Sequence, residues 1–183
     1  MILDHDLLVN AKSMDIFHGL KRTDRIVDIG AGIRPCRAFK AEHICIEPHH
    51  EYIAELRTCR EVSEIVEGEA ELVDRFPRQG TTVFLLDVIE HMERERGEKI
   101  RDLLMDFEQA VIFTPLGFME QSDKNPDAWG YNGGFWQKHR SGWQVEDFPG
   151  WEVTSWPVWH ARSMTGAILA IHDLHRDAVL AAA

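Results

Sequence analysis

The sequence predicts an α/β protein built around a mostly parallel β-sheet, in a single domain that spans residues 1–183. Short apolar runs recur along the chain, and two of them, Val83–Leu86 and Val111–Phe113, are apolar throughout, as expected for strands buried on both faces. Segments with the apolar spacing of a helix lie between such runs, and strands that alternate with helices form parallel sheets. A length of 183 residues is typical of one domain.

The individual elements follow from periodicity and from turn-forming residues. Each short apolar run is predicted to be a strand, over residues 25–29, 43–47, 64–67, 83–86, 111–113, 151–158 and 164–171. Helices are predicted where apolar residues recur every three or four positions, over residues 6–20, 49–57 and 93–108. Gly97 weakens the first half of the last helix, and Pro48 and Pro115 are expected to end the strands before them.

The composition is that of an ordinary soluble protein, with 44% hydrophobic and 28% charged residues. The net charge of −11 makes duplex nucleic acid an unlikely partner, because that affinity depends on Lys and Arg neutralising phosphates. No apolar run reaches the roughly 18 residues of a membrane helix, and the first residues lack the basic start of a signal peptide. The three cysteines stand far apart without a C-x-x-C pair, which predicts a reducing, cytoplasmic location. No feature predicts an oligomeric state.

A glycine turn follows the first predicted strand, in the run Asp28-Ile-Gly30-Ala31-Gly32. Glycines there let the backbone approach a ligand closely, and Pro35 suits the first turn of a following helix. A plain strand-to-helix turn is the alternative. The third glycine of a pyrophosphate-binding fingerprint is absent, and an acid at Asp28 suits a ligand with a cationic end. A sulfonium amino acid is therefore favoured over a dinucleotide, with a nicotinamide-dependent oxidoreductase as the competing enzyme class.

A second acid, Glu47, ends the second strand 19 residues after Asp28 and stands next to Pro48. A carboxylate at that place can accept two hydrogen bonds from a ribose diol, although a solvated acid at a strand end is equally compatible with the pattern. A third acid, Glu69, follows the third strand and is uninformative alone.

Taken together, these motifs resemble those of the class I S-adenosylmethionine (SAM)-dependent methyltransferases. The series comprises the glycine turn, Glu47, Gly68–Ala70, Leu86–His91 and Phe113–Pro115, in order after five successive strands. The resemblance implies a Rossmann-like, doubly wound, seven-stranded sheet of order 3-2-1-4-5-7-6 with the last strand antiparallel, and SAM as cofactor. It also implies that Asp28, Gly30, Ala31 and Gly32 cradle the methionine part, Glu47 and Pro48 the ribose, and Glu69 and Ala70 the adenine, with Asp87 and Val88 beside the methionine and the acceptor. A non-catalytic SAM-binding domain would show the same motifs.

His91 has three open interpretations: a local structural role, a general base or acceptor contact, or a metal ligand. If a helix begins at residue 87, Asp87, Glu90 and His91 share one face. This cluster with the later His139 resembles the divalent-metal site of small-RNA 2′-O-methyltransferases, but Asp87 stands where that family has Glu. The primary expectation is that no metal is bound and that His91 and His139 are the catalytic candidates.

Residues 116–143 contain five glycines and have no clear period. They include three of the six tryptophans, and all six lie beyond residue 128. So long a loop is either functional or conceals an element. We expect it to form a lid on the acceptor side, beneath which His91 and His139 converge. Phe118, Trp129, Trp136 and Trp143 are candidates for an aromatic wall or for the core, and the stretch 135–148 resembles one in bacterial class I methyltransferases of unassigned substrate. The acceptor, small molecule or polymer, is not predicted.

Overall fold

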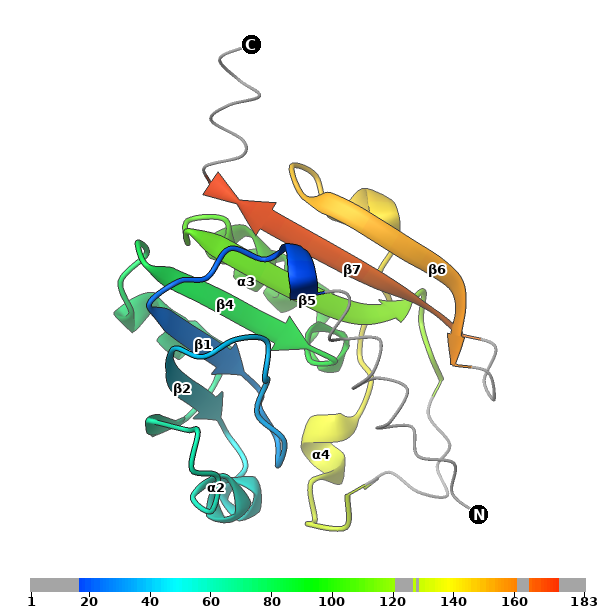
Figure 1. Ribbon diagram of the computed structural model, residues 1–183. Helices are drawn as coiled ribbons and strands as arrows, with labels where there is room; N and C mark the ends of the chain where they lie inside the picture. The colour runs from blue at the N-terminus through cyan, green and yellow to red at the C-terminus, as the bar shows by residue number, and fades with distance from the viewer. Residues whose placement is uncertain (1–16, 121–126, 128, 161–164, 175–183) are drawn as a thin grey trace.

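The protein is built around one seven-stranded sheet, whose strands lie in the order β3-β2-β1-β4-β5-β7-β6 (Figure 1). The computed structural model describes residues 17–120, 127, 129–160 and 165–174. The strands are β1 (Arg25–Ile29), β2 (Glu42–Glu47), β3 (Glu64–Glu67), β4 (Thr81–Leu86), β5 (Gln109–Leu116), β6 (Glu152–His160) and β7 (Thr165–Asp173). Strands β1 to β5 pair in parallel, whereas β7 runs antiparallel to both β5 and β6. The predicted fold class and strand order are confirmed.

The helices of the described residues are short. They are α2 (His50–Leu56), α3 (Arg94–Leu104) and α4 (Gly134–Gln137), with the 3₁₀ turns η1 (Phe17–Gly19), η2 (Ala70–Arg75), η3 (Ile89–His91) and η4 (Val145–Asp147). The predicted helix at 49–57 is confirmed, and the one at 93–108 is shorter than expected. Most of the predicted helix at 6–20 lies outside the described residues. In the described part of the chain, no helix has the length and apolar character needed to cross a bilayer.

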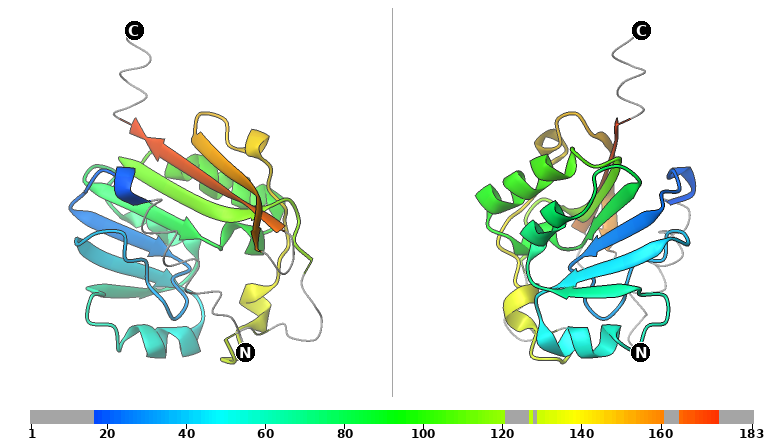
Figure 2. Two further views of the ribbon diagram at one scale, coloured as in Figure 1. Left: turned by 45° about the vertical axis from the view of Figure 1, so that its right-hand side comes forward. Right: turned by 90° about the vertical axis from the view of Figure 1, so that its left-hand side faces the viewer.

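The two faces of the sheet are covered differently. Figure 2 shows α3 on one face and η1 on the other. The α3 face carries the larger core, in which Ile100 and Leu104 of α3 pack with strand residues such as Val27 and Leu85. On the opposite face, Cys36 and Phe39 from the segment after β1 pack against the sheet together with η1. Both faces of the central strands are therefore buried, as their continuous apolar runs require.

The glycine turn is not followed by the helix that Pro35 led us to expect. Residues 30–41 form turns and bends instead. The Cys36 N–H is donated to the buried Asp28 carboxylate, with N···Oδ2 2.6 Å, rather than to a carbonyl four residues earlier. The side chain of Asp28 thereby holds the segment in an irregular conformation that packs directly on the sheet.

Pro115 does not end β5, which continues to Leu116 opposite β7. The Phe113 carbonyl accepts the Asp87 N–H on the β4 side, with N···O 2.8 Å. Because backbone groups alternate along a strand, the Pro115 nitrogen faces the same side, beyond Leu86, where β4 has ended. Its missing N–H therefore interrupts no strand pairing, which is the position where a strand tolerates proline.

Candidate functional site

A cavity of about 260 Å³ opens at the carboxyl ends of β1, β2 and β4. It lies where the strand order reverses between β1 and β4, which is the usual ligand position in open α/β sheets. Eight of the ten predicted cofactor-binding residues line it, namely Gly30, Gly32, Glu47, Pro48, Glu69, Ala70, Asp87 and Val88. Four of the five motifs that are separate in sequence therefore meet around one space, and Phe113–Pro115 is the motif that does not line it. Their contacts with a ligand stay a prediction.

The glycine turn needs glycine for two physical reasons. Gly30 and Gly32 have φ of +66° and +61°, a conformation that side chains disfavour. In addition, a Cβ on Gly30 would lie 2.7 Å from a methyl carbon of Val88. The turn and the segment after β4 therefore approach each other more closely than any other residue at position 30 would allow.

Asp28 and Ala31, the other two predicted residues, lie outside the cavity lining. Asp28 is buried behind the turn, where its carboxylate accepts the Cys36 N–H. Ala31 packs with Cys45 and Leu56. In this structure both residues support the turn from behind, and their predicted contact with the methionine part stays a prediction.

Glu47 is the most constrained acid of the cavity. One carboxylate oxygen accepts the Gly32 N–H at 2.8 Å and the other accepts the His49 N–H at 2.9 Å. Burial raises the pKa of Glu47, and the two N–H donors act in the opposite direction. Each oxygen keeps a second lone pair, so a carboxylate held in this way can still accept hydrogen bonds from a diol.

An aromatic wall faces the glycine turn. Trp129 lies against Gly32, since a Cβ on that glycine would come within 2.1 Å of the indole. The Trp129 ring also meets Tyr52 of α2, with 5.2 Å between centroids, and the Gln137 amide donates to the Tyr52 hydroxyl. Trp136 lines the same cavity. Two of the four aromatic candidates thus form part of the wall.

The other two aromatic candidates do not line the cavity. Trp143 is fully buried in the α3-face core. Phe118 is 60% exposed. The core interpretation is therefore the correct one for Trp143.

His91 lines the cavity, and His139, which is not among the lining residues, lies next to it, with 4.9 Å between ring centroids. Donor atoms of Glu90, His91 and His139 all fall within 4.8 Å of one another, whereas Asp87 is not in this group. Burial lowers the pKa of His91 to about 4, with the neighbouring His139 as the second cause, and burial raises the pKa of Asp87 to about 7. Both imidazoles are therefore neutral at neutral pH, since burial lowers the pKa of His139 as well.

His139 is placed next to His91 by backbone hydrogen bonds of the two residues that follow it in the sequence. The N–H groups of Arg140 and Ser141 both donate to the Glu90 carbonyl, at 2.8 and 3.1 Å. The His139 ring is itself oriented by a hydrogen bond between Nδ1 and the Met119 carbonyl, at 2.9 Å. The expected convergence of the two histidines is thus present, and their catalytic role stays a prediction.

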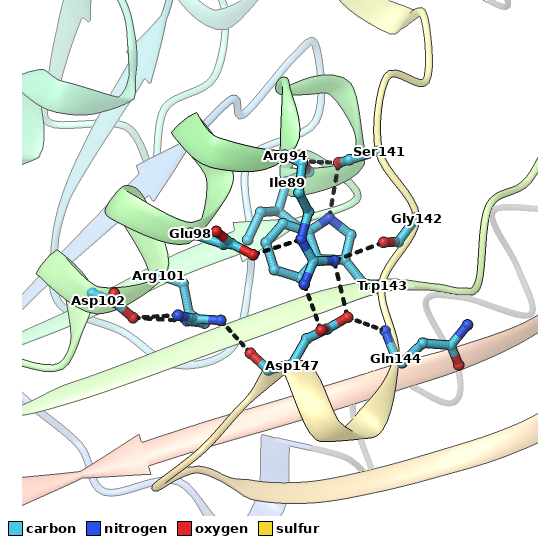
Figure 3. Close-up of polar contacts among 10 residues, drawn as sticks. All are labelled: Ile89, Arg94, Glu98, Arg101, Asp102, Ser141, Gly142, Trp143, Gln144 and Asp147. Atoms are coloured by element: carbon cyan, nitrogen blue, oxygen red, sulfur yellow. Dashed lines mark hydrogen bonds and ion pairs between the residues drawn. The ribbon is translucent and has the colours of Figure 1, made fainter.

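The same segment is anchored to α3 by the group of polar contacts in Figure 3. The Trp143 indole donates to Ser141 Oγ at 3.0 Å. Arg94 of α3 lies over the Trp143 ring, 4.1 Å from its centroid, and donates to Asp147 Oδ2 at 2.9 Å. Gly117 N–H donates to the Trp143 carbonyl at 2.7 Å. The long loop between residues 117 and 143 is therefore closed at its two ends.

Tyr52, Arg96 and Arg140 are among the lining residues that were not predicted from the sequence. Tyr52 belongs to the helix that follows Glu47, and that succession along the chain was the available signal. Arg96 pairs with Glu69 and Glu71 across the cavity rim, at 2.6 and 2.7 Å. No local pattern marks Arg96 or Arg140, because their positions depend on how α3 and the long loop pack.

Comparison with protein-family models and with curated proteins gives no match. Among solved structures, the chain is similar to a SAM-dependent methyltransferase from Archaeoglobus fulgidus, with TM-score 0.59, 16% identity, and coverage of 90% of this chain and 93% of that one. It is similar to the plantazolicin methyltransferase BamL in complex with a desmethyl substrate analog and SAH, with TM-score 0.57, 10% identity, and coverage of 90% and 82%. The DhpI–SAM–HEP complex gives TM-score 0.60, 11% identity, and coverage of 93% and 87%.

The fold is therefore that of the class I SAM-dependent methyltransferases. Its sheet also separates it from the dinucleotide-binding alternative. The common dinucleotide-binding order is 3-2-1-4-5-6, whereas here an antiparallel β7 stands between β5 and β6.

Proposed function

We propose that this protein binds SAM in the cavity and transfers its methyl group to an acceptor. The observation that carries the proposal is the meeting of eight motif residues around one cavity at the carboxyl ends of the strands. The lining holds four carboxyl groups, those of Glu47, Glu69, Asp87 and Glu93, against two guanidinium groups, those of Arg96 and Arg140, so its charge balance favours a cationic ligand. A pyrophosphate would meet these carboxylates, whereas the sulfonium and ammonium groups of SAM are attracted to them.

Within this proposal, Glu47 holds the ribose hydroxyls, Glu69 and Ala70 border the adenine, and the glycine turn with Asp87 and Val88 receives the methionine part. Methyl transfer is an in-line displacement at a carbon that positive sulfur already activates. The protein then mainly has to align the acceptor and exclude water.

His91 and His139 stand on the acceptor side of this arrangement. As neutral imidazoles they are in the form that can accept a proton from the attacking group. The described part of the predicted lid, residues 129–143, supplies Trp129 and Trp136 to the cavity wall. We propose that this loop selects the acceptor.

The first test is thermal unfolding with S-adenosylhomocysteine, NAD and NADP. A ligand at about 100 times its Kd stabilises the folded state by roughly 2.7 kcal/mol. For a chain of this size, that corresponds to a rise in Tm of about 5–11 °C. We expect this rise with S-adenosylhomocysteine alone, and stabilisation only by a dinucleotide would reject the proposal.

The second test assigns the ribose contact. Glu47→Gln keeps the shape of the side chain but removes its charge, and hydrogen bonds to a charged group contribute roughly 1.5–3 kcal/mol. Calorimetry should therefore show a loss of about one to two decades in S-adenosylhomocysteine affinity. Glu42→Gln, at the opposite and exposed end of β2 where Glu42 pairs with Arg25, is the matched control. Equal affinities of the two variants would remove Glu47 from the site.

A further inference from the structure

A second cluster of ligand-type side chains lies behind the glycine turn, outside the cavity. Asp28 on β1 stands directly opposite Cys45 on β2 in the parallel register. His43 is two residues before Cys45, so its side chain projects from the same face of the sheet. One donor atom from each of the three residues lies within 4.8 Å of the others, and all three side chains are buried.

The imidazole of His43 indicates that this cluster is more than ordinary packing. Its side chain is only about 6% exposed. Within the described residues, the buried Nε2 makes no hydrogen bond. Buried polar atoms normally have a partner. The nearest acceptor is Asp28 Oδ2, 3.5 Å away, which is too long for a good hydrogen bond.

The same distance suits two ligands of one metal ion. Zinc binds histidine nitrogen at about 2.0–2.1 Å and carboxylate oxygen at about 2.0–2.2 Å in tetrahedral geometry. Those bond lengths place the two donor atoms about 3.4 Å apart, close to the separation observed between His43 and Asp28.

We propose that Asp28, His43 and Cys45 form a binding site for Zn²⁺. One sulfur, one nitrogen and one oxygen donor suit zinc, whereas Mg²⁺ and Ca²⁺ require oxygen ligands. Binding exchanges the S–H bond of Cys45 for an S–Zn bond, and the proton leaves to solvent.

The position of the site gives the ion a structural role. Its ligands join β1 to β2 immediately before the glycine turn. Asp28 also accepts the Cys36 N–H, so a metal that fixes the Asp28 carboxylate would in turn hold the irregular segment after the turn on the sheet. The site is distinct from the group of Glu90, His91 and His139, which offers no sulfur.

The test uses Co²⁺ as a spectroscopic probe in place of Zn²⁺. The untagged full chain is refolded from urea with Co²⁺, so that burial of the site does not block loading. We expect one equivalent to bind with thiolate-to-cobalt absorption in the near ultraviolet and the strong visible bands of tetrahedral Co²⁺. Zn²⁺ should displace the cobalt and raise the Tm relative to the metal-free chain.

The variants assign the ligands. Cys45→Ala and His43→Gln should each weaken metal binding by more than the 10–100-fold that is typical of losing an outer-shell contact. Cys59→Ser, the half-buried third cysteine, and His139→Gln, in the other cluster, should leave the spectrum unchanged. Loss of the thiolate band in Cys59→Ser, or its survival in Cys45→Ala, would overturn the proposal.

A measurement on the wild-type chain covers the case in which a variant does not fold. X-ray absorption of the zinc-loaded protein should show one sulfur at about 2.3 Å together with nitrogen or oxygen at about 2.0–2.2 Å. A shell of nitrogen and oxygen alone, or no bound zinc, would also overturn the proposal. S-adenosylhomocysteine binding is measured separately, so this result is independent of the methyltransferase proposal.

Discussion

Gly97, in the middle of α3, is predicted to resist replacement by alanine even though alanine is the better helix former. Elsewhere in a helix, Gly→Ala stabilises by about 0.5–1 kcal/mol, because glycine loses more backbone entropy on folding. At this position a Cβ would lie 2.6 Å from Cζ2 of Trp143 and 3.2 Å from Cγ1 of Ile89. The first of these distances is too short for any two carbon atoms that are not bonded.

The size of this destabilisation depends on which neighbouring atoms can move to make room for the new Cβ. Trp143 is fully buried, packs on Phe148 and donates its indole N–H to Ser141, so its ring is held from several sides. Overpacking of such a site typically costs about 1–3 kcal/mol. Subtracting the helix-propensity gain leaves a net destabilisation of roughly 0.5–2 kcal/mol for Gly97→Ala.

Urea denaturation followed by circular dichroism measures this effect in a double-mutant cycle with Trp143→Phe. The smaller ring lacks the atoms that meet the new methyl group, so in that background Gly97→Ala should stabilise by about 0.5–1 kcal/mol. The expected coupling energy is therefore roughly 1–3 kcal/mol, within the range for residues in contact. If Gly97→Ala stabilises the wild-type chain, or if the cycle shows no coupling, the packing argument is wrong.

Three further predictions concern the site and its supports. Gly32→Ala introduces a side chain at φ +61° and against Trp129, and that conformation alone costs roughly 1–2 kcal/mol. S-adenosylhomocysteine affinity measured by calorimetry should therefore fall by about 5–30-fold, and an unchanged affinity would show that the turn does not contact the ligand. Trp129→Phe combined with Trp136→Phe should remove most of the change in tryptophan fluorescence that S-adenosylhomocysteine causes, because both rings line the cavity, and a change that persists would place the ligand elsewhere. Asp147→Asn should destabilise by about 0.5–1 kcal/mol at neutral pH, because a hydrogen bond from Arg94 lowers the pKa of Asp147. That difference is complete above the unfolded pKa of about 3.9 and is lost as the pH falls through the lower folded pKa, so chemical denaturation from pH 7 to pH 3 should show the two proteins converging in stability.

The sequence predicted the sheet well because strand formation here depends on local patterns. All seven strands were predicted, and each continuous apolar run is a strand that neighbours bury on both faces, as in β4 and β5. The failures concern residues whose conformation depends on distant partners. The helix expected after the glycine turn is absent because the Asp28 carboxylate binds Cys36 N–H. Strand β5 runs through Pro115 because β4 has already ended beside it.

The candidate site divides along the same line. Cofactor-side residues such as Gly30 and Glu47 could be predicted because each stands at a strand end, and parallel strands bring their carboxyl ends together. Arg96 and Arg140 could not be, because their places in the lining are set by how α3 and the long loop pack. Trp143 illustrates the limit, since its residue type suits a cavity wall and a core equally, and only the packing against Gly97 decides between them.

This division has a consequence for how the site can change. The cofactor side consists of strand ends and a glycine turn whose geometry is fixed by the sheet. Under the proposed function, the acceptor side is a loop whose ends are joined at Gly117 and Trp143 and whose contact with η3 is made by backbone and side-chain groups of Arg140 and Ser141. Because those anchors lie at Gly117 and at residues 140–143, the side chains of Phe135 and Trp136 do not supply them. Trp136 and Phe135, which line the cavity from this loop, can therefore vary with the acceptor while the cofactor side stays unchanged. We accordingly expect acceptor specificity to be altered by substitutions within residues 129–138, and SAM affinity by substitutions at the strand ends.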